Sequence, residues 1–171
     1  LIGGDVRLYW DQSVYKKPEA DKEFPWHQDN GYTYIEPQQY LTCWVALNNA
    51  TVENGCPWIV PCLHRLGTLE HRWTALGFEC LSDVEGAVPV ELEAGSIAVF
   101  SSLTPHRTGP NVTTGVRKRI SCSTPRMGPS RIRTAKRRSV AMRPTGNISS
   151  CGEGSPHDAG TGTAVMSCCT W

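Results

Sequence analysis

The sequence predicts one all-β domain, built as a sandwich or a barrel, followed by a tail of different character. Short segments with strand patterning recur over the first 124 residues, and turn-forming residues cluster between them. Short strands at such spacing are typical of antiparallel sandwiches and barrels. A length of 171 residues suits a single domain with a sizeable core. Seven segments qualify as strands: 5–10, 24–27, 40–47, 57–60, 88–92, 96–100 and 117–123.

The pattern of each segment indicates where its strand lies in a sheet. Residues 5–10 and 117–123 alternate apolar and polar side chains, as half-buried strands do. Residues 40–47 are almost continuously apolar, which predicts a central strand covered on both faces. Residues 24–27 and 57–60 are too short for a periodicity, but turn residues bound them.

The second half continues the same organisation. Residues 96–100 predict another central strand, and Pro89 places the segment 88–92 at a sheet edge, because proline cannot donate to a ladder. Residues 103–115, which contain two prolines and two glycines, predict a loop. Residues 64–83 show no clean periodicity, so a helical turn and a surface loop both remain open.

Residues 125–171 differ from the rest in charge and in pattern. They hold seven Lys and Arg against two acidic residues, a net +5, whereas residues 1–124 hold 10 basic and 14 acidic residues, a net −4. Without apolar periodicity, this basic tail is expected to be disordered or irregular. It could bind an anion such as a nucleic acid. A solvated tail without a partner is the favoured interpretation, and the oligomeric state is left open.

Several features bear on the compartment. No run approaches the roughly eighteen apolar residues of a membrane span, and the start LIGGDVRLYW lacks the pattern of a signal peptide. The eight cysteines do not cluster as they do in small secreted scaffolds. We therefore expect a reduced, cytoplasmic protein without a membrane partner. The missing initiator Met predicts a chain that is incomplete at its N-terminus.

The stretch FPWHQDNGY places His27 and Asp29 two positions apart at the end of a predicted strand. Side chains at i and i+2 of a strand lie on one face and could converge on a metal ion. A polar turn is the alternative for so short a motif. His106 also follows a predicted strand, and two His with one carboxylate form the facial triad of non-haem Fe(II) oxygenases. A structural zinc site would instead have four protein ligands.

Arg117 begins the last predicted strand of the domain. A planar guanidinium can hold a carboxylate through two parallel hydrogen bonds. The hydroxyl of Thr108, two residues after His106, could share that carboxylate.

Taken together, these segments closely resemble the phytanoyl-CoA dioxygenase family of 2-oxoglutarate-dependent oxygenases. The resemblance covers residues 5–124 and rests on PWHQDN, PHRTGPN and GVRKRISCS, with DVRLYWDQ and LTCWVALNNATVENGCPWIVPCLHR around the first motif. This chain departs from the family at Pro61-Cys62-Leu63-His64, where P-G-S-H is usual. It also lacks the family's longer helical N-terminal region.

The resemblance implies a double-stranded β-helix, a cupin-like jelly roll, over residues 1–124, with 125–171 as the tail. It implies that His27, Asp29 and His106 bind Fe(II), and that Arg117 and Thr108 hold the distal carboxylate of 2-oxoglutarate. Trp44 and Gln12 are candidates for the cosubstrate pocket, with core packing and surface exposure as their respective alternatives. Gln28 and Tyr32 are candidates for substrate contacts.

The implied activity is a dioxygenase that uses O₂ and 2-oxoglutarate to hydroxylate a small organic substrate, with release of succinate and CO₂. The alternative is a catalytically inactive family member that acts as a binding module. A serine hydrolase is not supported, because no G-x-S-x-G motif occurs. The sequence does not identify the substrate.

Overall fold

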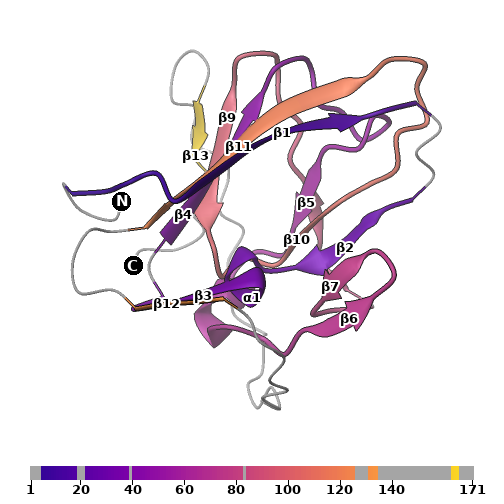
Figure 1. Ribbon diagram of the computed structural model, residues 1–171. Coiled ribbons are helices and arrows are strands. Elements are labelled where there is room, and N and C mark those ends of the chain that lie inside the picture. Colours follow the sequence, from indigo (N-terminus) through magenta and orange to yellow (C-terminus); the bar gives the residue numbers. More distant parts are fainter. Residues whose placement is uncertain are drawn as a thin grey trace.

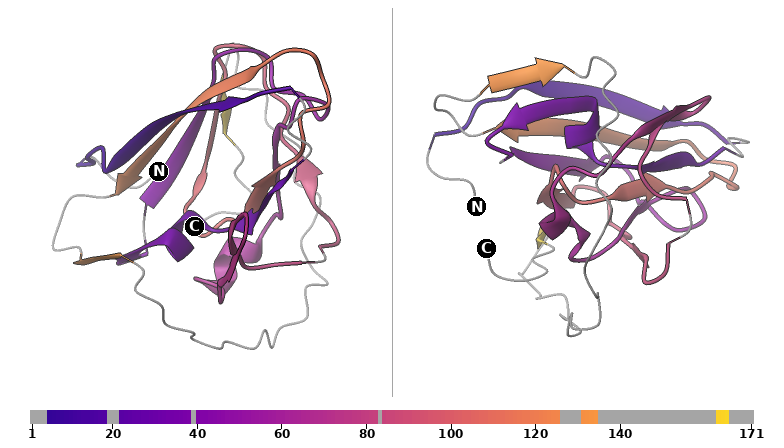
Figure 2. Two further views of the ribbon diagram at one scale, coloured as in Figure 1. Left: turned by 45° about the vertical axis from the view of Figure 1, so that its right-hand side comes forward. Right: turned by 90° about the horizontal axis from the view of Figure 1, so that it is seen from below.

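Two sheets face each other in the computed structural model, which describes residues 5–18, 22–38, 40–82, 84–125, 131–134 and 163–165 (Figures 1 and 2). The larger sheet has five strands in the order β1-β11-β4-β9-β13, and the smaller has four in the order β2-β10-β5-β8. All pairings in both sheets are antiparallel except β13 with β9. The predicted all-β jelly roll is confirmed.

The bounds of the strands are as follows. The larger sheet contains β1 (Trp10–Lys16), β4 (Tyr40–Ala46), β9 (Ile97–Ser101), β11 (Arg117–Pro125) and β13 (Thr163–Val165). The smaller sheet contains β2 (Phe24–His27), β5 (Pro57–Ile59), β8 (Val88–Pro89) and β10 (His106–Thr108). Two further pairs are β3 (Thr33–Glu36) with β12 (Arg131–Thr134), and β6 (Arg72–Thr74) with β7 (Gly77–Glu79). Among the described residues the helices are a single turn, α1 (Asp29–Tyr32), and a 3₁₀ turn, η1 (Leu63–Leu66).

The apolar core lies between the two sheets. The strand β4 lies between β11 and β9 in its sheet, and its residues are buried or half-buried along its whole length, as the apolar run predicts. The buried core cluster is drawn from both sheets and the loops between them: Trp44, Ala46, Ala50, Cys56, Ile59, Val90, Leu92, Ala98 and Phe100. An antiparallel ladder pairs β4 with β11, and both strands line the site described below.

Several expectations about individual elements need correction. The strand predicted at 5–10 lies later, as β1, because its ladder with β11 runs from Trp10 to Lys16. Residues 103–115 are not entirely loop, since they contain β10, which is paired on both sides. Within 64–83 the chain forms η1 and the β6–β7 hairpin. The segment 88–92 shortens to β8, which lies at the edge of the smaller sheet, as Pro89 predicts.

The basic tail is only partly within the described residues. Two of its segments are not irregular: β12 pairs with β3, and β13 pairs with β9. The predicted boundary at residue 124 stays a prediction, although β11 extends to Pro125. Among the residues that the structure describes, no helix is long and apolar enough to cross a membrane. Cys62 is disulfide-bonded, which differs from the expectation of reduced cysteines, whereas Cys43, Cys56, Cys80 and Cys122 are free thiols.

Candidate metal and cosubstrate site

The three predicted metal ligands come together at one end of the smaller sheet. His27 ends β2 and His106 begins β10, and the antiparallel ladder places these two residues directly opposite each other. Asp29 follows in the first turn of α1. Its Oδ1 lies 3.8 Å from Nε2 of His27 and 3.7 Å from Nε2 of His106. One candidate ligand atom from each residue lies within 4.8 Å of the other two.

Backbone carbonyls orient both imidazoles. The Nδ1 atom of His27 lies 2.8 Å from the carbonyl oxygen of Pro25, and Nδ1 of His106 lies 3.0 Å from that of Thr104. A carbonyl can only accept, so in each ring the proton is on Nδ1. The lone pair is therefore on Nε2, the atom that faces Asp29. Metal-binding histidines in proteins are commonly fixed by this type of contact.

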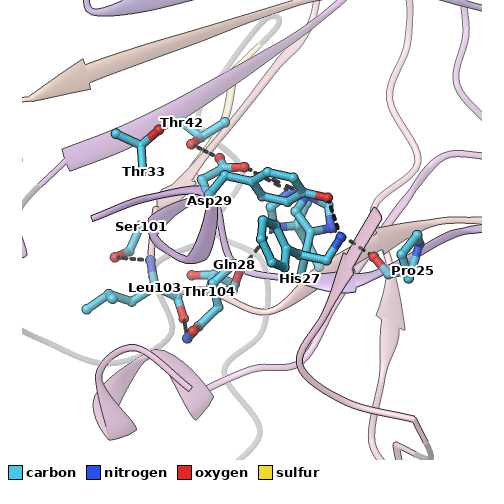
Figure 3. A network of polar contacts seen from close by, with 12 residues as sticks. Pro25, His27, Gln28, Asp29, Thr33, Thr42, Ser101, Leu103 and Thr104 are labelled. Carbon is cyan, nitrogen blue, oxygen red and sulfur yellow. Dashed lines mark hydrogen bonds and ion pairs between the residues drawn. The ribbon is translucent and has the colours of Figure 1, made fainter. Parts of the chain in front are cut away.

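The carboxylate of Asp29 is fixed in the same manner. The hydroxyl of Thr42, on β4 of the larger sheet, donates a hydrogen bond to Oδ2 of Asp29 (Figure 3). This contact leaves Oδ1 directed to the two imidazoles. The site therefore joins the two sheets, since its histidines belong to one and the residue that supports its carboxylate belongs to the other.

Burial and neighbouring groups together set the protonation states of the site. Desolvation, reinforced by His106, lowers the pKa of His27 to about 3, although Asp29 acts in the opposite direction. Burial alone would raise the pKa of Asp29, but His106, His27 and the hydroxyl of Thr42 together keep it below its ordinary value. A neutral imidazole at His27 beside an ionised carboxylate at Asp29 is the state that a divalent metal requires.

A cavity of about 690 Å³ opens beside these ligands, with walls from β1, β4, β10 and β11. Arg117 lines it and is 1% exposed, and its Nε and Nη1 atoms have no hydrogen-bond partner among the described residues. Burial lowers the pKa of its guanidinium only to about 10, so it is charged at neutral pH. Thr108, which is also buried, lines the same cavity. The two residues predicted to form the anion clamp therefore both line this cavity.

Lys16 is a cation beside this clamp that the sequence did not single out. Its Nζ donates to the carbonyl of Gly109 and lies 3.4 Å from the hydroxyl oxygen of Thr108. Burial, with a smaller effect from Arg117, lowers its pKa to about 8. Lys16 therefore adds positive charge to the wall that Arg117 and Thr108 form.

The other predicted pocket residues divide into two groups. Trp44, Gln12 and Tyr32 all line the cavity. The guanidinium of Arg117 lies over the indole of Trp44, 5.2 Å from the ring centroid, so Trp44 both packs in the core and supports the clamp. The hydroxyl of Tyr32 accepts a hydrogen bond from the backbone of Phe78, and its ring packs edge-on against His27.

Gln28 requires a correction, because it does not line the cavity. It is fully buried, and its amide nitrogen donates to the carbonyls of Gly67 and Leu103, while its amide oxygen accepts from the backbone of Leu69. Its two polar atoms are thus engaged by loops behind the site. The expected substrate contact is replaced by a structural role, which fixes the loops against the segment that carries His27 and Asp29.

Arg119 is a cavity residue that the sequence reasoning missed. It lies two positions after Arg117 on β11, and side chains at i and i+2 of a strand share a face. That spacing is the signal that could have found it. The usual exposure of arginine side chains argues against this inward position.

Comparisons with known proteins identify the family to which these residues belong. Residues 3–119 match the model of the family described as phytanoyl-CoA dioxygenase. A probable phytanoyl-CoA dioxygenase of Caenorhabditis elegans is 32% identical over 122 residues, which are 64% of this chain and 39% of that protein. A methylphosphonate hydroxylase of Gimesia maris is 32% identical over 121 residues, 70% of this chain and 45% of that protein.

A solved structure resembles the fold as well. It is EvdO2 from Micromonospora carbonacea complexed with 2-oxoglutarate, which is 27% identical and has a TM-score of 0.64. The match covers 77% of this chain and 54% of that one. The chain spans only about two fifths of the length of the curated relatives that it matches.

Proposed function

Because the chain belongs to the phytanoyl-CoA dioxygenase family, we propose that it is an Fe(II)- and 2-oxoglutarate-dependent dioxygenase that hydroxylates a small organic substrate. One observation carries the proposal: three oriented ligand atoms adjoin a cavity whose buried arginine donors have no acceptor among the described residues. Three metal ligands beside unpaired arginine donors suit an oxyanion that also chelates the metal.

The side chains fit a divalent iron. Two Nε2 lone pairs and one carboxylate oxygen form a three-ligand set, which is the donor set of non-haem Fe(II) oxygenases and leaves positions for other ligands. Bound Fe(II) would supply the activation of O₂, coupled to conversion of 2-oxoglutarate to succinate and CO₂ and to hydroxylation of a substrate C–H bond.

The protein's own contribution is orientation and shielding. Arg117 would grip the distal carboxylate of 2-oxoglutarate through parallel N–H donors, and the hydroxyl of Thr108 would add a further donor. The guanidinium of Arg117 stacks over the indole of Trp44, which holds it in place. The burial of Arg117 and Thr108 excludes water from that end of the cavity, which strengthens each charge-assisted bond.

A second candidate is a binding module that holds metal and 2-oxoglutarate without turnover. The observation behind it is that the match covers less than half of each relative's length. Turnover could then require residues that this chain does not match. Both functions predict binding, and only the first predicts product.

The test is succinate formation by the purified chain supplied with Fe(II), ascorbate and 2-oxoglutarate, first alone and then with a panel of small substrates. We expect succinate that depends on Fe(II) and rises with the right substrate, with Asp29→Ala as the inactive control. Binding of 2-oxoglutarate without any succinate would favour the binding module. Absence of 2-oxoglutarate binding would overturn both.

A further inference from the structure

A second buried guanidinium lies in the cavity, and the clamp for 2-oxoglutarate does not need it. Arg119 has the same inward direction on β11 as Arg117. Its Nε and Nη1 atoms are buried and have no hydrogen-bond partner among the described residues. A buried charge without a partner is costly, so such donors in native proteins are normally satisfied by something.

The surroundings of Arg119 are built to hold its side chain inside. The β-ladders place it between Val14 of β1 and Ala46 of β4, two residues that leave room for a long neighbour. Its guanidinium lies 5.6 Å from the ring centroid of Trp44, the same indole that Arg117 covers. The Nε1 atom of Trp44 also has no partner among the described residues. The wall therefore presents several buried N–H donors that have no hydrogen-bond partner among the described residues.

The formal charges of the cavity lining leave more than one cation in excess. A divalent metal, ionised Asp29 and doubly ionised 2-oxoglutarate sum to one negative charge, and Arg117 cancels it. Arg119 is then uncompensated, and Lys16 adds to the same excess. The lining also contains the acidic residue Glu23, but its carboxylate already forms an ion pair with Arg107. A substrate that carries negative charge would restore the balance.

Along β11, Arg119 lies two residues nearer than Arg117 to Ser123, and Ser123 pairs with Thr42, the residue whose hydroxyl holds Asp29. Asp29 raises the pKa of Arg119, and Arg119 contributes to lowering the pKa of Asp29. Burial and repulsion by Arg117 lower the pKa of Arg119 to about 10, so it is charged at neutral pH. A group held by Arg119 would thus lie near the reacting centre, beside the cosubstrate.

We propose that Arg119 binds an anionic group of the substrate to be oxidised, a carboxylate, phosphate or phosphonate, over the indole of Trp44. This inference rests on the proposed function and narrows the substrate class to small anions. A guanidinium forms paired bonds with each of these groups. A cavity of about 690 Å³ is within the size range of small-molecule sites.

The experiment uses the chain loaded with Mn(II) under saturating 2-oxoglutarate, with butyrate, phosphate and the neutral isostere butyramide as probes. Binding is followed by tryptophan fluorescence, because Trp44 contacts the proposed site, and by calorimetry. We expect butyrate or phosphate to bind and butyramide not to. The variant Arg119→Gln should lower the affinity for the anions by roughly tenfold or more, since a charge-assisted hydrogen bond is lost.

The matched control is Lys118→Gln, which removes a charge from the neighbouring, exposed position of β11 and should leave all three probes unaffected. The variant Arg119→Lys keeps the charge and should fall between wild type and Arg119→Gln. It also preserves the test if the glutamine variant does not fold. Unchanged anion binding in Arg119→Lys and Arg119→Gln, or no anion binding by the wild type, would overturn the proposal.

A separate titration of 2-oxoglutarate distinguishes this inference from the proposed function. If the wild type does not bind 2-oxoglutarate, the proposed function fails. If it binds and Arg119→Gln binds it equally well while losing the anions, both proposals stand. If Arg119→Gln loses 2-oxoglutarate instead, Arg119 belongs to the cosubstrate clamp, and the proposal of a substrate site is overturned.

Discussion

At the scale of single residues, one hydrogen bond fixes the direction of each candidate ligand. Both imidazoles donate Nδ1–H to the carbonyl two residues earlier in the chain, so each is oriented by its own local segment. Asp29 instead depends on Thr42, a residue of the opposite sheet. The carboxylate is therefore the ligand whose position requires the two sheets to be in place.

The variant Asp29→Ala should abolish iron-dependent turnover and most metal binding, because it removes the only carboxylate of the candidate triad. Metal titration and succinate formation would measure the effect. Asp11→Ala serves as the control, since Asp11 is exposed and lies outside the cavity lining. Near wild-type succinate formation in the Asp29 variant would contradict the metal assignment.

The variant Arg117→Lys should lower the affinity for 2-oxoglutarate by roughly ten- to a hundredfold, because lysine keeps the charge but loses the paired donors. Metal affinity should change little, since Arg117 is not among the ligand atoms. Separate titrations of metal and 2-oxoglutarate test this, with Lys118→Arg as the reciprocal control at the next position. An equal loss of both affinities would mean that Arg117 is structural.

The low pKa of His27 predicts a loss of stability in acid. The unfolded imidazole takes up a proton near pH 6.5, whereas burial delays protonation in the folded protein to about pH 3. The unfolded state thus binds more protons between these values, and the free energy of unfolding falls with falling pH, by at most about 1.4 kcal/mol per unit for one proton. Asp29, whose pKa is also lowered, acts in the same direction at the acid end.

Urea unfolding of the metal-free protein from about pH 7.5 to about pH 5 would measure this dependence. His27→Gln should flatten it, because glutamine does not titrate. A variant as acid-sensitive as the wild type would show that other groups dominate this pH range.

At the scale of elements, the sequence predicts those strands whose side chains carry the signal. The apolar run of β4 and the alternation of β11 identify both, and the same alternation puts Arg117 on the inner face. The strand β10 has only three residues and lies between Pro105 and Gly109, so no periodicity can reveal it. Its existence depends on pairing with β2 and β5, which are distant in the sequence.

Residue type and order predict the candidate metal ligands, but they do not predict the positions of Arg119 and Gln28. Whether an arginine lies inside depends on the room that Ala46 and Val14 leave across the ladder. Whether Gln28 faces the cavity depends on the loops at Gly67 and Leu103, which compete for its amide. Both outcomes follow from tertiary contacts.

The structural role of Gln28 predicts that Gln28→Ala destabilises the fold by about 1–3 kcal/mol, because buried loop groups lose their partners. The affinity of the folded variant for 2-oxoglutarate should be close to that of the wild type. Chemical denaturation and ligand titration measure the two quantities. Ser13→Ala, at an exposed position of β1 outside the cavity lining, should change neither quantity. A large, selective loss of ligand affinity in the Gln28 variant would restore it as a contact residue.

At the scale of the whole molecule, the two sheets are held together by a shared core and by the hydrogen bond from Thr42 to Asp29. The core lies toward the β5 and β8 side of the smaller sheet, while the candidate metal ligands lie at β2 and β10. The cavity thus occupies the part of the sandwich where apolar packing gives way to charged and polar side chains.

The pairing of His27 with His106 has a thermal consequence. An ion held by both residues would act as a cross-link that closes a large loop of chain, and such closures remove conformational entropy from the unfolded state. Any ligand that binds only the native state raises the free energy of unfolding, by about 2.7 kcal/mol at a hundred times its dissociation constant. Adding Mn(II) should therefore raise the melting temperature by several degrees, and a chelator should reverse the rise. In Asp29→Ala the metal should leave the melting temperature unchanged; an equal rise there would place the ion elsewhere.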